Sequence, residues 1–187
     1  MYFKKAILLY NEKIKGGNTK TSVGQLAIWH YLLGRIGVYS KDDALAKENY
    51  ASALRFYKEK QGTNKLSVSD TKRLKKIINY YLSLNNHLNA TNAWQILLDD
   101  RIVKYGNNDG RTGFAYYEVA RLYEYQDKYN LAEEYYKKSL QSYEGSPSIG
   151  KNHQVLINVL TAWSDMLEKL MRDDEAETAL IRAKKIS

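Results

Sequence analysis

Residues 114–138 have the sequence FAYYEVARLYEYQDKYNLAEEYYKK, and this stretch decides the fold. Tyr116 and Val119 begin a series of bulky residues in steps of three and four, the spacing of one face of an α-helix. A short polar run interrupts the series, and a second periodic segment follows with Ala132 and, one turn later, Tyr136. The stretch therefore predicts two helices joined by a tight turn.

The same pattern occurs four times along the chain. The small residue of the second helix recurs at intervals of 44, 42 and 44 residues, as Ala46, Ala90, Ala132 and Ala176. A bulky or aromatic residue lies 16 positions before each alanine, at His30, Leu74, Tyr116 and Leu160. A large apolar residue lies four positions after each, at Tyr50, Trp94, Tyr136 and Leu180. One such helix pair cannot bury its apolar stripe alone, so we expect neighbouring pairs to stack.

The repeat predicts where the helices and units lie. First helices are expected at about 27–40, 71–85, 113–127 and 157–171, and second helices at about 43–60, 87–105, 129–144 and 173–186. The units are then 27–70, 71–112, 113–156 and 157–187, preceded by a partial unit at 1–26 with a second helix at 2–14. Because the first helix of that partial unit is missing, we expect the chain to be a piece of a longer protein. The alternative is that 2–14 is a natural N-terminal cap.

This pattern resembles the tetratricopeptide (TPR) repeat. Its signature of a large residue, Leu-Gly, Tyr, Ala and Phe is matched best by Tyr116…Val119-Ala120…Tyr123…Ala132…Tyr136 and by His30…Leu33-Gly34…Ala46…Tyr50. The period exceeds the usual ~34 residues, which resembles the extended repeats of kinesin light chains and bacterial multi-repeat sensors. The resemblance implies an all-α fold, a right-handed α-solenoid of antiparallel helix pairs.

The composition excludes several kinds of chemistry. The 187 residues include no cysteine, which removes disulfides, zinc–thiolate sites and a cysteine nucleophile. His30, His87 and His153 form no helical metal-binding pair, and we expect His30 and His87 to be packing residues. We therefore predict no cofactor, no metal and no enzymatic activity. No apolar stretch is long enough to span a membrane, which favours a soluble protein of either the cytoplasm or the periplasm, with any export signal upstream of Met1.

The resemblance also implies a ligand-binding surface, because the first helices of this family line a concave groove. The slots carry over to Tyr31, Arg35, Tyr39, Lys72, Lys75, Asn79, Tyr117, Arg121, Tyr125 and Asp165. Tyrosine interleaved with arginine and lysine suits an extended peptide with acidic or aromatic residues, although any of these tyrosines could instead pack between units. The carboxylate clamp of some family members is absent, since Glu118 stands where the clamp needs an asparagine.

The charge is concentrated in one part of the chain. Residues 1–76 hold 16 Lys and Arg against 6 Asp and Glu, whereas residues 77–187 hold 13 against 15. We expect a non-catalytic scaffold that binds another protein or an extended peptide in its groove. The alternative is a peptide-sensing module of a larger bacterial signalling or transcription-regulating protein. Nucleic-acid binding is a weaker hypothesis that rests on the charge alone.

Overall fold

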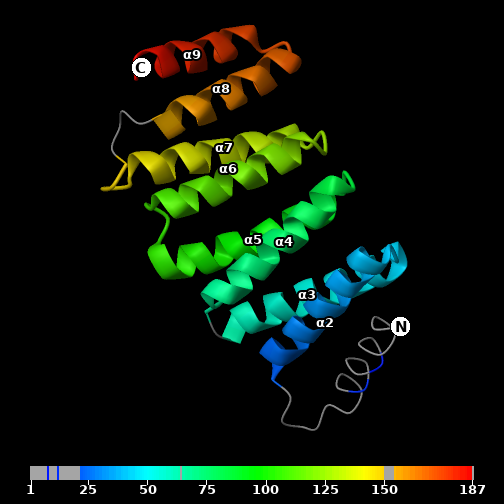
Figure 1. Cartoon of the computed structure of the whole chain (residues 1–187). Helices are drawn as coiled ribbons and strands as arrows, with labels where there is room; N and C mark the ends of the chain where they lie inside the picture. The colour runs from blue at the N-terminus through cyan, green and yellow to red at the C-terminus, as the bar shows by residue number, and fades with distance from the viewer. Residues whose placement is uncertain (1–7, 9–11, 13–21, 64, 150–153, 187) are drawn as a thin grey trace. The chain divides into compact units, whose positions relative to one another are not determined.

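The computed structural model describes residues 8, 12, 22–63, 65–149 and 154–186 (Figure 1). Every regular element in these residues is an α-helix. The chain divides into two compact units, Met1–Leu84 and Asn85–Ser187, which we call unit 1 and unit 2. The helix expected at 2–14 lies outside the described residues, apart from Leu8 and Glu12.

Unit 1 contains three described helices, α2 (Val23–Ser40), α3 (Asp43–Thr63) and α4 (Val68–Ser83). Helices α2 and α3 are joined by a tight turn and pack along their length, and α4 contacts α3. The core between them is rich in tyrosine, since Tyr50, Tyr57 and Tyr81 are all at most 3% exposed. An aromatic ring buries a large apolar area, so these residues dominate the packing of the unit.

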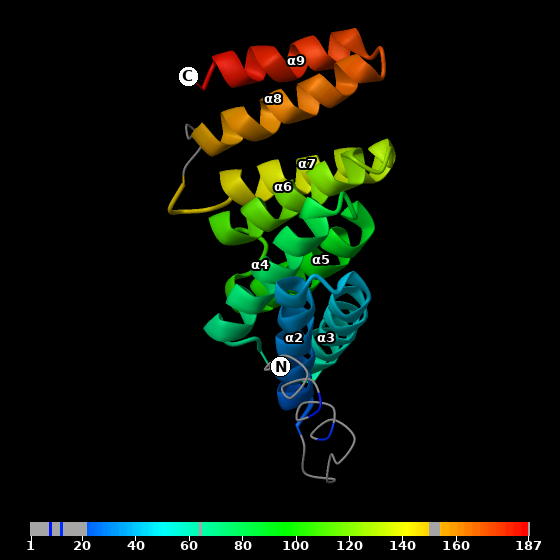
Figure 2. The same cartoon turned by 45° about the vertical axis from the view of Figure 1, so that its right-hand side comes forward.

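Unit 2 contains α5 (His87–Tyr105), α6 (Gly110–Glu124), α7 (Tyr129–Glu144), α8 (Gln154–Lys169) and α9 (Asp173–Lys184). Each of these helices packs against the next one along the chain, and Figures 1 and 2 show α6 with α7 and α8 with α9 as successive hairpins. One continuous apolar core runs through α6 to α9, from Ala120 to Ala183. The stacking of helix pairs that the sequence predicts is thus present inside this unit.

The first helices begin three or four residues earlier than the periodicity predicts, at Val23, Val68, Gly110 and Gln154. Local capping explains three of these starts. Ser22 and Ser67 each accept a hydrogen bond from a backbone N–H three residues on and form a capping box, and Asp109 accepts from the backbone of Arg111. These polar side chains satisfy orphan donors before the apolar stripe starts, so apolar spacing alone places the helix start too late.

The backbone repeats as regularly as the sequence does. Each of the turns inside the four sequence repeats contains one non-glycine residue with a left-handed backbone, at Lys41, Asn85, Asp127 and Met171, with φ between 51° and 57°. Each of these residues lies five positions before the alanine of its repeat. The same local geometry therefore recurs at the same place in all four copies.

Small residues let paired helices approach closely, as their positions predict. Ala46, Ala90, Ala132 and Ala176 are all at most 1% exposed. A Cβ atom added to Gly37 would lie 2.5 Å from the backbone nitrogen of Ala46, which is closer than real packing allows. The crossing of α2 and α3 therefore depends on the absence of a side chain at Gly37.

Candidate functional site

Helix α2 carries a ladder of three predicted groove residues one turn apart. Arg35 Nη2 donates a hydrogen bond of 3.2 Å to the hydroxyl of Tyr39. The Arg35 guanidinium carbon lies 5.9 Å from the ring centre of Tyr31 and 5.5 Å from that of Tyr39. A guanidinium held between two aromatic rings is attracted to both, which restricts its position. We call Tyr31, Arg35 and Tyr39 the α2 ladder.

Helix α6 repeats this arrangement 86 positions later in the sequence. Arg121 Nη2 donates a hydrogen bond of 3.1 Å to the hydroxyl of Tyr125, and its guanidinium carbon lies 5.8 Å from the rings of both Tyr117 and Tyr125. We call Tyr117, Arg121 and Tyr125 the α6 ladder. The two units therefore present the same side-chain motif at equivalent repeat positions.

Within each ladder the two tyrosines have different surroundings. In α2, Tyr31 is 3% exposed and its ring centre lies 6.1 Å from that of Tyr50, whereas Tyr39 is 64% exposed. In α6, Tyr117 is half-buried at the same 6.1 Å distance from its partner ring in α7, whereas Tyr125 is 57% exposed. The inner tyrosine anchors the ladder to the core, and the outer tyrosine faces solvent.

The outer tyrosine of each ladder interacts with a residue of another helix. The hydrogen bond and the charge of Arg35 lower the pKa of the exposed Tyr39 hydroxyl, and Lys76 of α4 adds to the effect through its charge. In unit 2, His87 stacks on Tyr125 with 4.9 Å between ring centres, which supports the outer ring from α5.

The predicted residues of α4 form an exposed basic surface. Lys72, Lys75 and Asn79 are exposed, as is Lys76. Among the residues that the structure describes, none of these three lysines forms an ion pair. We call Lys72, Lys75 and Lys76 the α4 lysines, and they are available to a ligand.

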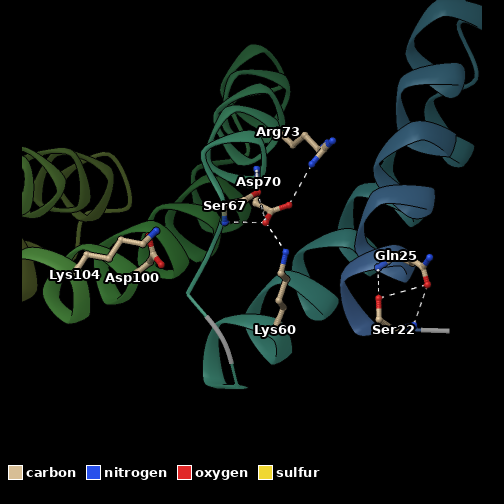
Figure 3. A network of polar contacts seen from close by, with 8 residues as sticks. All are labelled: Ser22, Gln25, Lys60, Ser67, Asp70, Arg73, Asp100 and Lys104. Carbon is tan, nitrogen blue, oxygen red and sulfur yellow. Dashed lines mark hydrogen bonds and ion pairs between the residues drawn. The ribbon is translucent and has the colours of Figure 1, made fainter. Parts of the chain in front are cut away.

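The one acidic residue of α4 is engaged in folding the unit. Asp70 is 1% exposed and accepts hydrogen bonds from Lys60 at 2.5 Å, from Ser67 at 2.7 Å and from Arg73 at 3.2 Å (Figure 3). Burial alone would raise the pKa of Asp70, but the hydrogen bonds from Lys60 and Ser67 outweigh it and hold the pKa below its usual value. Asp70 therefore neutralises Lys60 and Arg73 rather than the α4 lysines.

Unit 2 places an acidic residue next to its ladder. Glu118 of α6 is half-buried and forms no hydrogen bond or ion pair with any described residue. Burial raises the pKa of Glu118, while the positive charges of Arg121 and Arg101 act against this rise. Asp165, the predicted groove residue of α8, is exposed and lies apart from the ladder contacts.

Arg101 is a residue of this surface that the sequence analysis did not single out. Its guanidinium carbon lies 5.5 Å from the ring of Trp94 and 5.8 Å from the ring of Phe114, and Nη1 donates a 2.7 Å hydrogen bond to the backbone oxygen of Arg111. Burial lowers its pKa. Arg101 belongs to a second helix, and the repeat signature marks only the first-helix slots as candidates.

His30 and His87 have the packing roles that the sequence predicts. His30 stacks on Phe56 with 5.4 Å between ring centres, and its Nδ1 lies 3.0 Å from Asn49 Oδ1. Burial lowers the pKa of His30. In the described part of the chain no group of three His, Cys, Asp or Glu residues is arranged to hold a metal ion. No helix in the same part is both long and apolar enough for a membrane span.

A hollow of about 440 Å³ lies away from both ladders. It is open and is lined by one residue of α8, Glu168, and five of α9, namely Asp173, Glu177, Leu180, Ile181 and Lys184. No predicted groove residue lines this hollow. Its mixed lining shows no pairing of a nucleophile with a general base, so it does not have the features of a catalytic site.

Comparison with known proteins bears on the fold. No protein-family model matches the chain, and no curated protein matches its sequence. Among solved structures, BtubC (BKLC) from P. vanneervenii is similar over 98% of this chain and 72% of its own, with a TM-score of 0.60 and 18% sequence identity. BtubC has a TPR-like helical-repeat fold. The regular elements in the described residues of this chain are all helices and share that fold class, and at this identity the likeness concerns the fold alone.

Proposed function

We propose that this chain is a non-catalytic interaction scaffold that binds an extended segment of another protein in a groove lined by its first helices. The repeated Tyr-Arg-Tyr ladder carries the proposal, because neither fold nor packing requires an arginine between two tyrosines twice. In each ladder the inner ring packs against a core tyrosine, the outer ring is exposed, and the arginine between them is half-buried. Such a motif offers a rigid ring and a charged donor fork at low entropic cost to a ligand.

The surroundings of the ladders support the same conclusion. Two further predicted groove residues, Asn79 of α4 and Asp165 of α8, are exposed and offer a hydrogen-bonding group and a charge. A helical-repeat fold presents such residues on successive helices, so one extended peptide can contact several repeats. Binding of this kind distributes the affinity over a few anchors, typically tyrosine, tryptophan and arginine.

The test is capture of a protein partner by the immobilised chain, followed by charge reversal on the proposed surface. Arg121→Glu with Lys75→Glu should abolish the capture, since it places carboxylates where the proposal needs cationic donors. Lys47→Glu with Lys58→Glu is the matched control, because both lysines are exposed on α3 and the change in net charge is the same. Undiminished capture by the folded first variant would refute the proposal, as would equal loss by the control.

A further inference from the structure

The two ladders have the same geometry but opposite electrostatic surroundings. The hydrogen bonds from arginine to the outer tyrosine measure 3.2 Å in α2 and 3.1 Å in α6. The position that holds Glu118 beside the α6 ladder holds Leu32 beside the α2 ladder, 86 positions earlier. One ladder therefore has a built-in carboxylate neighbour and the other has an apolar one.

In unit 2 the positive charge of the ladder is compensated locally. Glu118 lies close enough for its charge to act on Arg121, and Arg121 in turn acts on Glu118. Neither forms an ion pair with another described residue. The unit as a whole holds 13 Lys and Arg against 15 Asp and Glu. An anionic ligand at the α6 ladder would meet repulsion from Glu118 as well as attraction from Arg121.

In unit 1 the charge of Arg35 has no acidic neighbour on its own helix, because α2 contains no Asp or Glu. Among the described residues Arg35 forms no ion pair, and its side chain donates a hydrogen bond to the Tyr39 hydroxyl. Tyr50 of α3 connects the ladder to α4, since its ring centre lies 6.1 Å from that of Tyr31 and 4.8 Å from that of Tyr80.

The α4 lysines are exposed without an ion pair in the described residues. Asp70, the acid of α4, is buried and already paired. Unit 1 holds 16 Lys and Arg against 6 Asp and Glu.

We propose that the α2 ladder and the α4 lysines together form a receptor for a run of carboxylates on the partner protein. This rests on the proposed function. Arg35 would use its donor fork on one carboxylate, as arginine does in bidentate pairs. The α4 lysines would act as more mobile charges that concentrate an acidic segment at the surface.

A polypeptide fits this surface better than a nucleic acid does. Salt-dependent binding of a nucleic acid needs a track of cations along the phosphate backbone, typically ~6–10 contacts. Here the excess positive charge is confined to unit 1, since unit 2 is slightly acidic. Arg35 also lies near both rings of its ladder, so these rings are not open for bases to stack on them.

The experiment uses the full chain and a fluorescein-labelled hexaglutamate peptide, with binding followed by fluorescence anisotropy at low salt. Arg35→Gln should weaken binding about tenfold, the effect of losing one charge-assisted contact. Arg55→Gln is the matched control, because it removes an exposed arginine of α3 that also lies over an aromatic ring, 4.7 Å from that of Phe56, and it should leave the affinity within about twofold. Arg35→Lys keeps the charge and loses the fork, so it should fall between the two.

Several results would overturn the inference. Equal weakening by Arg35→Gln and Arg55→Gln would show that the peptide responds to net charge rather than to the α2 ladder. Absence of hexaglutamate binding by the wild-type chain would show that unit 1 is no carboxylate receptor, even if the capture test of the scaffold succeeds. Tighter binding of a single-stranded RNA hexamer than of hexaglutamate would favour a nucleic acid. Far-UV circular dichroism of each variant separates these results from loss of the fold.

Discussion

Replacement of Gly37 by alanine should destabilise unit 1 through a clash between two helix backbones. The added Cβ would lie 2.5 Å from the nitrogen of Ala46, 2.8 Å from its Cα and 2.9 Å from the backbone oxygen of Asp42. Ordinary contact begins at 3.4 Å, and the atoms met belong to the backbone, which cannot rotate away. Helices α2 and α3 must therefore separate locally, by about 0.9 Å at the nearest atom pair.

The magnitude follows from two opposing effects. Overpacking of a close contact costs ~1–3 kcal/mol, and a contact with backbone atoms belongs in the upper part of that range. Alanine in a helix interior is favoured over glycine by about 1 kcal/mol, which offsets part of the cost. We expect Gly37→Ala to lower the free energy of unfolding of unit 1 by about 1–2 kcal/mol.

The matched control is Gly62→Ala in helix α3, where an added Cβ meets nothing within 4 Å. Only the helix propensity acts there, so we expect a gain of up to about 1 kcal/mol. Urea unfolding followed by circular dichroism at 222 nm measures both variants against the wild type. If Gly37→Ala stabilised the chain as much as Gly62→Ala, the close crossing at Ala46 would be refuted.

Three further predictions concern stability. The pKa of Asp70 is lowered in the folded state, so its contribution to stability is present above about pH 4 and is lost as the pH falls through the folded pKa. Asp70→Asn should lower the free energy of unfolding by about 2 kcal/mol at pH 7. It should also weaken the fall of the urea midpoint at acid pH, when that midpoint is measured as a function of pH. Met171 has φ 56° and is 89% exposed, so Met171→Gly should raise the thermal midpoint, by relief of ~1 kcal/mol; no rise would argue against the left-handed turn. The buried Tyr136 hydroxyl donates to Glu124 at 2.8 Å, so Tyr136→Phe should destabilise unit 2 by about 1–2 kcal/mol in chemical denaturation, and a neutral result would remove that bond.

The ends of the helices show which bounds the local sequence pattern predicts correctly. The predicted bounds of α5 and α7 agree with the structure, because polar turns flank both apolar stripes. The starts of α2 and α4 were predicted too late. Their caps, Ser22 and Ser67, lie ahead of the first stripe residue and act through single hydrogen bonds to the backbone. A capping box of Ser with Gln or Asp three residues later was the signal that could have found them.

The tyrosines show what the spacing of residues along a helix does not predict. The sequence leaves packing and ligand contact equally open for each of them, because a first-helix tyrosine has the same spacing in either role. In the structure Tyr31 is buried against Tyr50, whereas Tyr39, two turns further on, is 64% exposed. That difference depends on where the neighbouring helix lies, and spacing along one helix carries no such information.

The sequence by itself determines the repeat, the helix pairs, the close alanine crossings and the Tyr-x3-Arg-x3-Tyr spacing, because all of these are periodic along one helix or across one short turn. Only the tertiary structure decides which charges remain available. Asp70 and Lys60 become partners across two helices, and Lys76 comes to act on Tyr39. Electrostatic interaction depends on distance and burial in space, so a count of charged residues shows that unit 1 is basic but not which of its cations a ligand would meet.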